Sequence, residues 1–336
     1  MENNFLSAFK RIISTQKKIV IIPHRNPDGD ALGSALALKH FLDAKKHNVS
    51  VVSPNDYPTF LKWLPGESDI IKFSKTPSIA RDKINKAKLI FGLDFNSLSR
   101  IQDLSEIVKK TKVDKIMIDH HESPEFFANL NYSDPSMSST CEMVYNIINA
   151  SDSKLLDKKI ACCLYTGIMT DTGSFRYPST TSMTHQVVSH LINLGANGSD
   201  IHQKIFDSSS LSRLKLLGIS LSNLIKIPDL PVVYITLSKE ELVLCDFKKG
   251  DTEGFVNYGL SLKGVNFSCM MIENENEGKI KMSFRSQGGF SVDNFARNYF
   301  NGGGHLNAAG GVSMESLDKT ITHFKNALKN HISELI

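Results

Sequence analysis

The sequence predicts an α/β protein of two domains, the first built on a parallel sheet that helices cover on both faces. Near-continuous apolar runs at residues 18–22, 89–93 and 115–118 indicate buried strands, because strands covered on both faces lack polar alternation. Stretches with helical periodicity separate these runs, and after about residue 190 the pattern changes to shorter, alternating segments. A chain of 336 residues is long enough for two domains that each bury a core.

The elements of the parallel sheet follow one another through the first half of the chain. The run KIVII at 18–22 predicts a strand, and residues 30–46 predict a helix that packs on the sheet through side chains such as Leu32 and Leu36. Further strands are expected at 49–52, at 89–93 (LIFGL) and at 115–118 (KIMI). Helices are expected at about 139–149 and at 158–169, the second apolar nearly all round and therefore buried.

The second half begins after a cluster of helix-breaking residues at 194–198. A helical stretch at about 200–226 resembles a linker, and the segments VVYITL, NFSCMMIE and KIKMSF then predict strands. A glycine cluster and a final helix at about 317–335 complete the chain. We therefore expect a first domain at 1–190, a helical linker at 191–226 and a second domain at 227–336.

Composition excludes several classes of protein. The net charge of +4 is too small for a protein that binds long duplex nucleic acid, and it suits small anionic substrates. The five cysteines form no C-x-x-C pair, so the chain predicts neither a disulfide framework nor a thiolate zinc site. We find no signal peptide and no run of about 18 apolar residues. A cytoplasmic protein without a membrane segment is expected.

Polar side chains that can bind metal ions follow three of the predicted strands. In an open parallel sheet, ligands bind beyond the carboxyl ends of the strands, so these side chains should share one crevice. A fourth acid ends the buried segment at 158–169, where an unpaired carboxylate would be costly. The residues concerned are His24, Asp28 and Asp30, spaced H-x-x-x-D-x-D, then Asp94, then Asp119, His120 and His121, and finally Asp171.

Each of these motifs alone has an ordinary structural explanation. Asp-Gly-Asp is common in turns, a histidine pair can be polar packing, and Asp171 can be a helix-end residue bonded to amides. All of these explanations would have to hold together at four strand or helix ends, so we favour a shared cation site. Mixed carboxylate and imidazole ligands without thiolate suit Mn²⁺, Mg²⁺ or Fe²⁺. Two such ions about 3.5–4 Å apart can activate water and clamp a phosphoryl group.

A second candidate site lies near the C-terminus. Gly302, Gly303 and Gly304 precede His305, and consecutive backbone N–H groups of glycines can form an anion nest. The alternative for the glycines is a flexible turn, and the small residues that follow would let a helix pack tightly. Arg285, at the end of a predicted strand, is suited to bidentate phosphate contact. Arg176 is a further candidate for substrate contact, with a solvated surface residue as the alternative.

These motifs together resemble those of a known family. IIPHRNPDGDALGSALAL, GLDFNS, MIDHH and GIMTDTGSFRY are similar, in this order, to the four signature motifs of the DHH phosphoesterases. NGGGHLNAAGG resembles the glycine-rich motif of the DHHA1 domain that follows in one subfamily. The resemblance covers almost the whole chain, and it implies a parallel-sheet α/β DHH domain joined by the helical linker to a smaller α/β DHHA1 domain with a mixed sheet.

The resemblance also implies roles for single residues. Asp94 would bridge two divalent cations, most simply Mn²⁺, with Mg²⁺ or Fe²⁺ as alternatives. His121 would face the substrate phosphate, and Asp119 would orient the histidine pair. Arg285 and the loop of Gly302, Gly303, Gly304 and His305 would hold the end of the nucleotide away from the scissile phosphate. The first cation would take His24, Asp28 and Asp94, and the second Asp30, Asp94, His120 and Asp171.

Stand-alone members with this layout are nanoRNase-like enzymes that hydrolyse short RNA oligonucleotides and remove the 3′-phosphate of 3′-phosphoadenosine 5′-phosphate (pAp). Hydrolysis of cyclic di-AMP or of its linear product pApA is the second interpretation, because larger members of that kind carry membrane and sensor segments that we do not expect here. A nucleotide sensor that binds without turnover is the alternative of another class. The sequence leaves the preferred substrate, the native metal and assembly as a homodimer open.

Overall fold

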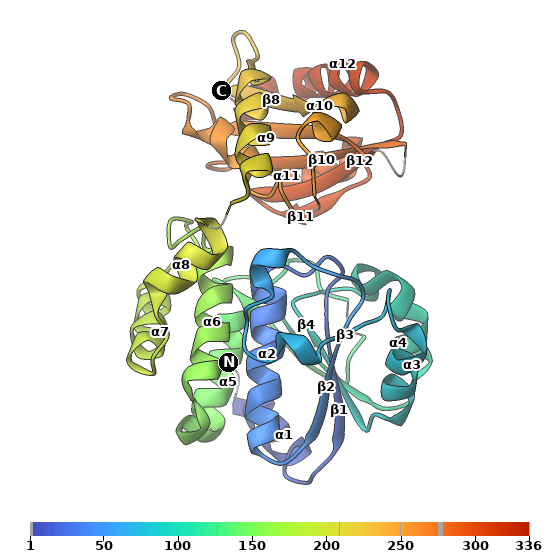
Figure 1. Ribbon diagram of the computed structural model, residues 1–336, viewed down its shortest axis with the longest axis vertical. Coiled ribbons are helices and arrows are strands. Elements are labelled where there is room, and N and C mark those ends of the chain that lie inside the picture. Colours follow the sequence, from blue (N-terminus) through green and yellow to red (C-terminus); the bar gives the residue numbers. More distant parts are fainter. Residues whose placement is uncertain (1–2, 126, 208, 249, 275–277, 336) are drawn as a thin grey trace. The chain divides into compact units, whose positions relative to one another are not determined.

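A computed structural model describes residues 3–125, 127–207, 209–248, 250–274 and 278–335. The chain forms two compact units that divide between residues 208 and 209, and each unit contains a sheet with helices packed on it (Figure 1). The predicted α/β class and the parallel sheet of the first part are confirmed. The mixed sheet that the family resemblance implies for the second part is confirmed as well.

The sheet of the first unit has the strand order β3-β2-β1-β4-β5-β6, and every neighbouring pair of strands is parallel. From β1, the strands β2 and β3 follow toward one edge of the sheet, and β4, β5 and β6 then follow toward the other edge. The strand order therefore reverses between β1 and β4, and a parallel sheet opens a crevice at such a point. The strands are β1 (Lys18–Pro23), β2 (Asn48–Ser53), β3 (Ile71–Lys72), β4 (Leu89–Leu93), β5 (Asp114–Asp119) and β6 (Leu130–Ser133).

Helices cover both faces of this sheet, as the near-continuous apolar strands predict. Ile21 packs with the core under α2, α5 and α6, whereas its neighbour Ile22 packs with α3 and α4 on the opposite face. The helices are α1 (Asn3–Ile12), α2 (Gly29–Ala44), α3 (Pro77–Lys86), α4 (Ser105–Lys110), α5 (Thr140–Asp152), α6 (Lys158–Asp171), α7 (Ser182–Asn193) and α8 (Gly198–Phe206), with short 3₁₀ turns at Thr59–Leu61, Glu67–Asp69, Leu98–Leu104 and Ser153–Leu155.

The sheet of the second unit has the order β11-β12-β10-β9-β8-β7 and is mixed, because β8 and β9 are parallel while the other neighbours are antiparallel. Its strands are β7 (Ile225–Lys226), β8 (Val232–Leu237), β9 (Phe267–Asn274), β10 (Lys279–Ser286), β11 (Gly303–His305) and β12 (Ala308–Ser313). Its helices are α9 (Leu211–Ser222), α10 (Lys239–Leu244), η5 (Phe255–Ser261), α11 (Val292–Tyr299), α12 (Leu317–Leu328), η6 (Lys329–His331) and α13 (Ile332–Leu335).

Two cores stabilise the second unit. Phe284 of β10 packs with Phe295 of α11 and Phe324 of α12 on one face of the sheet. On the other face, Ile235 of β8 and Met270 of β9 pack under α9, α10 and η5. Along β10, side chains alternate between that first core and a partly exposed face, and Arg285 belongs to the exposed set. This alternation places Arg285 on the outer face of the β10–β12–β11 half of the sheet.

Some elements differ from the sequence-based expectations. The small residues after the glycine cluster form strand β12, paired with β11 as a hairpin, and not a tightly packed helix. The expected linker holds two helices, of which α8 lies in the first unit and α9 in the second. The last helix is interrupted, since α12 ends at Leu328 and a 3₁₀ turn precedes α13. Within the described residues, no helix is both long enough and apolar enough to cross a bilayer.

Candidate metal centre

Three adjacent strands deliver the candidate ligands to one edge of the sheet. His24 follows β1, Asp94 follows β4, and Asp119 is the last residue of β5, with His120 and His121 directly after it. Because β1, β4 and β5 are parallel neighbours, these residues leave the sheet side by side at the point where the strand order reverses. All five side chains are buried.

Asp28 and Asp30 reach the same edge through the start of α2. Asp28 is the N-cap of that helix, and its Oδ1 accepts hydrogen bonds of 3.0 Å from the amides of Asp30 and Ala31. Its other oxygen, Oδ2, lies 3.6 Å from His24 Nε2. The H-x-x-x-D-x-D spacing therefore spans the end of a strand, a tight turn and the start of a helix. This arrangement brings the side chains of His24, Asp28 and Asp30 to the same edge of the sheet.

A distant helix N-terminus holds the Asp30 carboxylate. Its Oδ2 accepts a 2.7 Å hydrogen bond from the amide of Thr140, and its Oδ1 a 2.8 Å bond from the amide of Cys141. These amides belong to the first turn of α5, which has no helical acceptors for them and carries partial positive charge. The hydroxyl of Thr140 donates to Asp94 Oδ1 at 3.0 Å. Thr140 thus fixes two candidate ligands at once.

Close contact between α2 and α6 brings Asp171 to the cluster. A Cβ atom added at Gly33 would lie 2.5 Å from the carbonyl oxygen of Cys163. A Cβ atom at Gly167 would lie 2.2 Å from Cys141 Sγ and 2.8 Å from Asp30 Oδ1. Only glycine fits at these contacts, and the resulting approach of the helices sets Asp171, the last residue of α6, beside the strand ends. Its Oδ2 lies 3.2 Å from His120 Nε2.

Asp94 lies between two histidines. Its Oδ2 is 3.4 Å from His24 Nε2, and its Oδ1 is 3.7 Å from His120 Nε2. The residue has a φ of 64°, in the left-handed region that aspartate and asparagine tolerate better than most residues. The amide of Asp94 donates to the Ile118 carbonyl at 3.0 Å, which fixes this turn against β5. Each carboxylate oxygen of Asp94 therefore faces a different imidazole.

Two of the histidines have a defined tautomer. His24 Nδ1 lies 2.8 Å from the carbonyl oxygen of Arg25, and His120 Nδ1 lies 3.2 Å from that of Met137. A carbonyl oxygen only accepts, so each Nδ1 must carry the proton. Each Nε2 then faces the carboxylates, and it can bind a cation through its lone pair once it has lost its proton. This arrangement is typical of metal-binding histidines, whose other ring nitrogen is held by a backbone or carboxylate acceptor.

His121 is oriented differently from the other two histidines. Its Nδ1 lies 2.7 Å from Asp119 Oδ1, and its backbone amide donates to Asp119 Oδ2 at 3.1 Å. Burial, together with the nearby Asp94 carboxylate, raises the pKa of Asp119 to about 6. Burial also lowers the pKa of His121 well below its ordinary value. The fully buried Asp119 side chain thus holds the imidazole in one orientation.

The buried carboxylates and imidazoles of the cluster strongly shift one another's pKa values. Burial alone would lower the pKa of His24, but the carboxylates of Asp28 and Asp94 outweigh burial and raise it to about 10. Burial and the neighbouring carboxylates of Asp94 and Asp171 raise the pKa of Asp30 well above its usual range. Burial opposes ionisation of Asp94 too, yet the adjoining imidazoles hold its pKa well below normal. The carboxylates can all be ionised only if cations are close by.

The donor set fits divalent cations. His24, Asp28 and Asp94 offer ligand atoms within 4.8 Å of one another, and so do Asp30, His120 and Asp171. Asp94, Asp119 and His121 form a third such group. Oxygen and imidazole donors without thiolate suit Mn²⁺, Mg²⁺ or Fe²⁺. The first unit therefore contains acid and histidine groups able to hold metal ions, with Asp94 between the first two groups.

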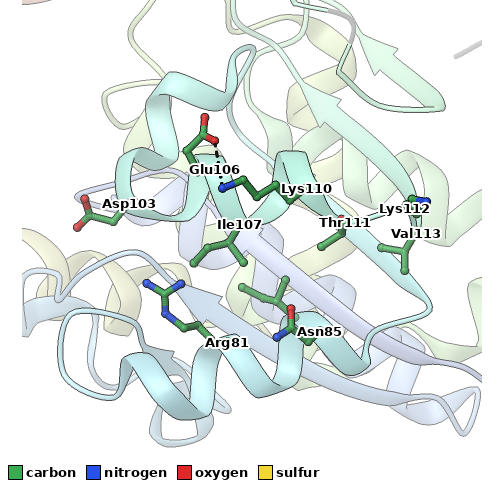
Figure 2. A pocket seen from close by; sticks show the side chains of 10 residues that line it. Arg81, Asn85, Asp103, Glu106, Ile107, Lys110, Thr111, Lys112 and Val113 are labelled. Carbon is green, nitrogen blue, oxygen red and sulfur yellow. Dashed lines mark ion pairs between the residues drawn. The ribbon is translucent and has the colours of Figure 1, made fainter.

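A hollow of about 420 Å³ elsewhere in the first unit takes no part in this cluster. Figure 2 shows it between α3 and α4, with Arg81 and Asn85 on one side and Glu106 and Lys110 on the other, the last two 3.9 Å apart. Residues 111–113, which also line it, precede β5, so the hollow lies at the opposite edge of the sheet from the strand ends. Its charges are mixed and solvated, and they suggest no chemistry.

Arg176 lies in a tight turn just after Asp171. Its Nε donates to the Gly173 carbonyl at 2.8 Å, and the residue is exposed. Gly173, Ser174 and Phe175 all have left-handed backbone, with φ between 55° and 64°. This turn keeps Arg176 next to the end of α6. Both interpretations given above, contact with the substrate and a solvated surface position, fit this place.

The glycine cluster of the second unit has a different structure from the expected anion nest. The amide of Gly302 donates to the Ala296 carbonyl at 3.1 Å, and that of Gly304 donates to Asp293 Oδ1 at 2.5 Å. Two of the three amides are therefore already committed within the chain. A Cβ atom at Gly302 would lie 1.9 Å from the Gly310 carbonyl oxygen. The glycines here allow close approach of backbone segments, and the amides of Gly302 and Gly304 are already bonded within the chain.

Sheet register relates Arg285 to His305. Arg285 pairs with Ala308 across β10 and β12, and Ala308 pairs with His305 across β12 and β11. Directly paired residues point to the same face of an antiparallel sheet, so both side chains lie on the outer face of the second unit. Two strand spacings separate them, about 10 Å.

Sequence reasoning missed several residues that build these sites. Thr140 and Gly167 in the first unit and Asp293 in the second hold candidate ligands or the glycine hairpin in place. Only weak signals pointed to them, namely the Ser-Thr pair that begins a predicted helix and the lone glycine in a helix that is apolar nearly all round. The contact between Thr140 and Asp30 joins residues 110 positions apart, which no local pattern reports.

Comparison with known proteins agrees with this architecture. Residues 18–168 match the family model described as DHH family, N-terminal domain, and residues 238–334 match the DHHA1 domain. The bifunctional oligoribonuclease and PAP phosphatase NrnA of Thermus thermophilus is 30% identical over 89% of this chain and 85% of its own length. The cyclic-di-AMP phosphodiesterase GdpP of Bacillus subtilis is 26% identical over 96% of this chain and 49% of its own length.

Solved structures agree with these matches. An exopolyphosphatase-related protein from Bacteroides fragilis superposes with a TM-score of 0.95 at 41% identity, covering 99% of this chain and 98% of that one. RecJ from Thermus thermophilus, solved with Mn²⁺, shares the fold with a TM-score of 0.57 at 12% identity, over 99% of this chain and 55% of RecJ. The chain therefore belongs to the DHH family of phosphoesterases, hydrolases that act on phosphoester bonds, and its second unit carries a DHHA1 domain.

Proposed function

We propose that this protein hydrolyses short oligoribonucleotides to mononucleotides and removes the 3′-phosphate of pAp, in a reaction that depends on divalent cations. The observation that carries the proposal is the position of Asp94, whose two oxygens face two different histidine Nε2 atoms at 3.4 and 3.7 Å. A carboxylate so placed can be shared by two cations. The similarity to a relative named as an oligoribonuclease and PAP phosphatase supports the substrate class.

Two sets of side chains would hold the cations. His24, Asp28 and Asp94 would bind one, and Asp30, Asp94, His120 and Asp171 the other. Mn²⁺ is our first choice because the set mixes imidazole with carboxylate and contains no thiolate, and Mg²⁺ or Fe²⁺ are the alternatives. When bound, such cations neutralise negative charge on a phosphoryl group and lower the pKa of water.

The chain's own residues would prepare this site and move the proton. The N-terminus of α5 holds the Asp30 carboxylate in place through the amides of Thr140 and Cys141. Asp119 fixes the imidazole of His121 through a 2.7 Å contact, and its negative charge stabilises the imidazolium that forms when His121 takes up a proton. His121 would then stabilise charge on the substrate phosphate or protonate the leaving oxygen.

The two parts of the chain would divide the work. Residues 1–190 would carry the chemistry, residues 191–226 would link the parts, and residues 227–336 would hold the nucleotide end away from the scissile phosphate. Arg285 and His305 on the outer face of the second unit, with the hairpin of Gly302, Gly303 and Gly304, would supply this contact. Arg176, close to Asp171, would contact the substrate near the reacting phosphate.

Hydrolysis of cyclic di-AMP or pApA is the second candidate. The similarity to GdpP favours it, although the chain spans only 49% of that relative. Both candidates use the same cluster, and they differ in whether the substrate must present a terminal phosphate or a closed ring. A nucleotide sensor without turnover is the alternative of another class, and it predicts ligand binding with no product.

A substrate panel tests the proposal. Purified protein with Mn²⁺ is assayed for kcat/KM on pApA, pAp, a five-residue RNA, cyclic di-AMP and pyrophosphate. We expect the highest values for pApA or the short RNA, with release of phosphate from pAp as a second activity. Preference for cyclic di-AMP would favour the second candidate. Binding of these nucleotides without any product at any metal concentration would favour the sensor.

Asp94→Asn is the matched active-site variant. Asparagine accepts the left-handed backbone at this position, so the fold is kept while the bridging charge is lost. We expect kcat to fall by at least about 10³-fold and one of two bound Mn²⁺ ions to be lost. Asp103→Asn removes an exposed carboxylate at the 420 Å³ hollow and should leave both quantities unchanged. Near-normal kcat in Asp94→Asn would refute the shared-carboxylate assignment.

A further inference from the structure

An ion pair on α11 is built into the glycine hairpin of the second unit. Arg297 Nε lies 3.0 and 2.9 Å from the two carboxylate oxygens of Asp293, one helical turn earlier. The same Asp293 Oδ1 accepts the amide hydrogen of Gly304 at 2.5 Å. Asp293 is only 13% exposed, whereas Arg297 is 53% exposed. The carboxylate of Asp293 is therefore largely shielded from solvent and links the helix to the hairpin, whereas the guanidinium of Arg297 is exposed.

The head of Arg297 lies at the same face of the sheet as His305. A Cβ atom added at Gly303 would lie 3.2 Å from Arg297 Cζ and from Nη2. Gly303 and His305 are two positions apart on β11, so their Cβ directions point to the same face. That face also carries Arg285 through the register of β10, β12 and β11. Two arginines and one histidine thus lie around one patch of sheet.

The residues at the centre of this patch have small side chains or none. Ala308 separates Arg285 from His305 in the register, and Gly310 pairs with Gly303 beneath the Arg297 head. Side chains of this size would not keep a phosphate group from reaching Arg285, His305 and Arg297. The amides of Gly302 and Gly304 already donate hydrogen bonds to Ala296 and Asp293, so they are not available to bind an anion. A ligand anion at this patch would have to be held by side-chain donors.

We propose that Arg297, anchored by Asp293, binds a phosphate group of the nucleotide on the outer face of the second unit, together with Arg285 and His305. This inference rests on the proposed function and names one more residue that would determine substrate choice. The guanidinium is planar and presents several donors, which suits a phosphate oxygen pair better than an ammonium group would. Asp293 fixes one edge of that plane by its contacts to Nε, so little conformational freedom remains to be lost on binding.

An ordinary surface ion pair one helical turn apart would have no such consequence. Pairs of that kind contribute little and do not touch other segments. Asp293 differs because it also holds the Gly304 amide, and Arg297 differs because it packs against Gly303. Loss of Asp293 should therefore move both the hairpin and the guanidinium, while loss of Arg297 should remove only the phosphate contact.

Calorimetric binding of AMP and of adenosine to the full-length protein tests the proposal without requiring turnover. Wild type should bind AMP more tightly than adenosine. Arg297→Gln should weaken AMP binding about 10- to 100-fold and leave adenosine binding unchanged, because a charge-assisted contact to phosphate is lost. Arg297→Lys should fall between the two. Lys281→Gln is the matched control, since it removes one charge from an exposed position of β10 on the same face, and it should behave as wild type.

Hydrolysis supplies the second measurement. Arg297→Gln should raise KM for pApA, which carries a terminal phosphate, while kcat stays within about twofold and KM for ApA is unaffected. An Arg297→Gln variant that matches Lys281→Gln in AMP binding overturns the inference, and so does a wild-type protein that binds AMP and adenosine equally. Failure of wild type to hydrolyse any member of the substrate panel would instead count against the proposed function, because the AMP measurement is independent of turnover.

Discussion

The contact between α2 and α6 allows a sharp test of how the metal centre is positioned, through the substitution Gly167→Ala. Gly167 lies in the middle of α6, and an added methyl group would point at Cys141 Sγ, 2.2 Å away, and at Asp30 Oδ1, 2.8 Å away. No active-site group is removed by this change. Any loss of activity would therefore come from displacement of Asp30, either directly or through Cys141, whose amide bonds to it.

The size of the effect follows from these distances. An optimal nonbonded separation is about 3.5 Å, so the first contact must open by about 1.3 Å and the second by about 0.7 Å. Overpacking of this kind costs about 1–3 kcal/mol, against a gain of about 1 kcal/mol from replacing glycine by alanine in a helix. We expect a net loss of up to about 2 kcal/mol. A displacement of Asp30 by about 0.5–1 Å should lower kcat by 10- to 100-fold, by order of magnitude.

Three measurements and one control complete the design. Urea unfolding gives the change in free energy, Mn²⁺ titration gives the affinity of the site, and hydrolysis of pApA gives kcat and KM. Gly218→Ala in α9 is the control, because a Cβ atom there meets nothing within 4 Å. It should stabilise the protein by about 0.5–1 kcal/mol through helix propensity alone, with unchanged activity. A Gly167→Ala variant that also gains stability and keeps wild-type kcat would refute the packing argument.

Three further predictions concern other contacts. Thr140→Val keeps the shape of the side chain but removes the 3.0 Å hydrogen bond to Asp94, so kcat/KM for pApA should fall about tenfold with an unchanged circular dichroism spectrum. Arg285→Ala should raise KM for pApA about tenfold or more while Mn²⁺ affinity stays constant, and the reverse result would refute the proposed division of labour. Burial opposes ionisation of Asp56, but the hydrogen bonds from Lys75 and Lys72 outweigh it and hold the pKa of Asp56 well below its ordinary value. Because the folded pKa is depressed, the carboxylate stabilises the fold above about pH 4 and this contribution is lost as pH falls further. Asp56→Asn should therefore cost about 1 kcal/mol in urea unfolding at pH 7, and its difference from wild type should shrink toward pH 2.

The sequence by itself determined the architecture of the first unit and named the residues of its candidate metal centre. Short apolar runs such as LIFGL are typical of strands covered on both faces, and parallel strands have their carboxyl ends at one edge of the sheet. His24, Asp94 and His120 follow three such runs, so their convergence was predictable from order and spacing alone. This inference succeeds because strand direction and burial are local properties of the chain.

Only the tertiary structure decided how the ligands are held and how the second site is built. The amide of Thr140 bonds Asp30 from 110 positions away, and Gly167 matters because another helix presses on it. The glycine cluster, which local chemistry marks as an anion nest, pairs as a hairpin whose Gly304 amide is taken by Asp293. Local sequence states which donors a segment offers. Which acceptors reach those donors depends on segments that are distant in the chain and close only after folding.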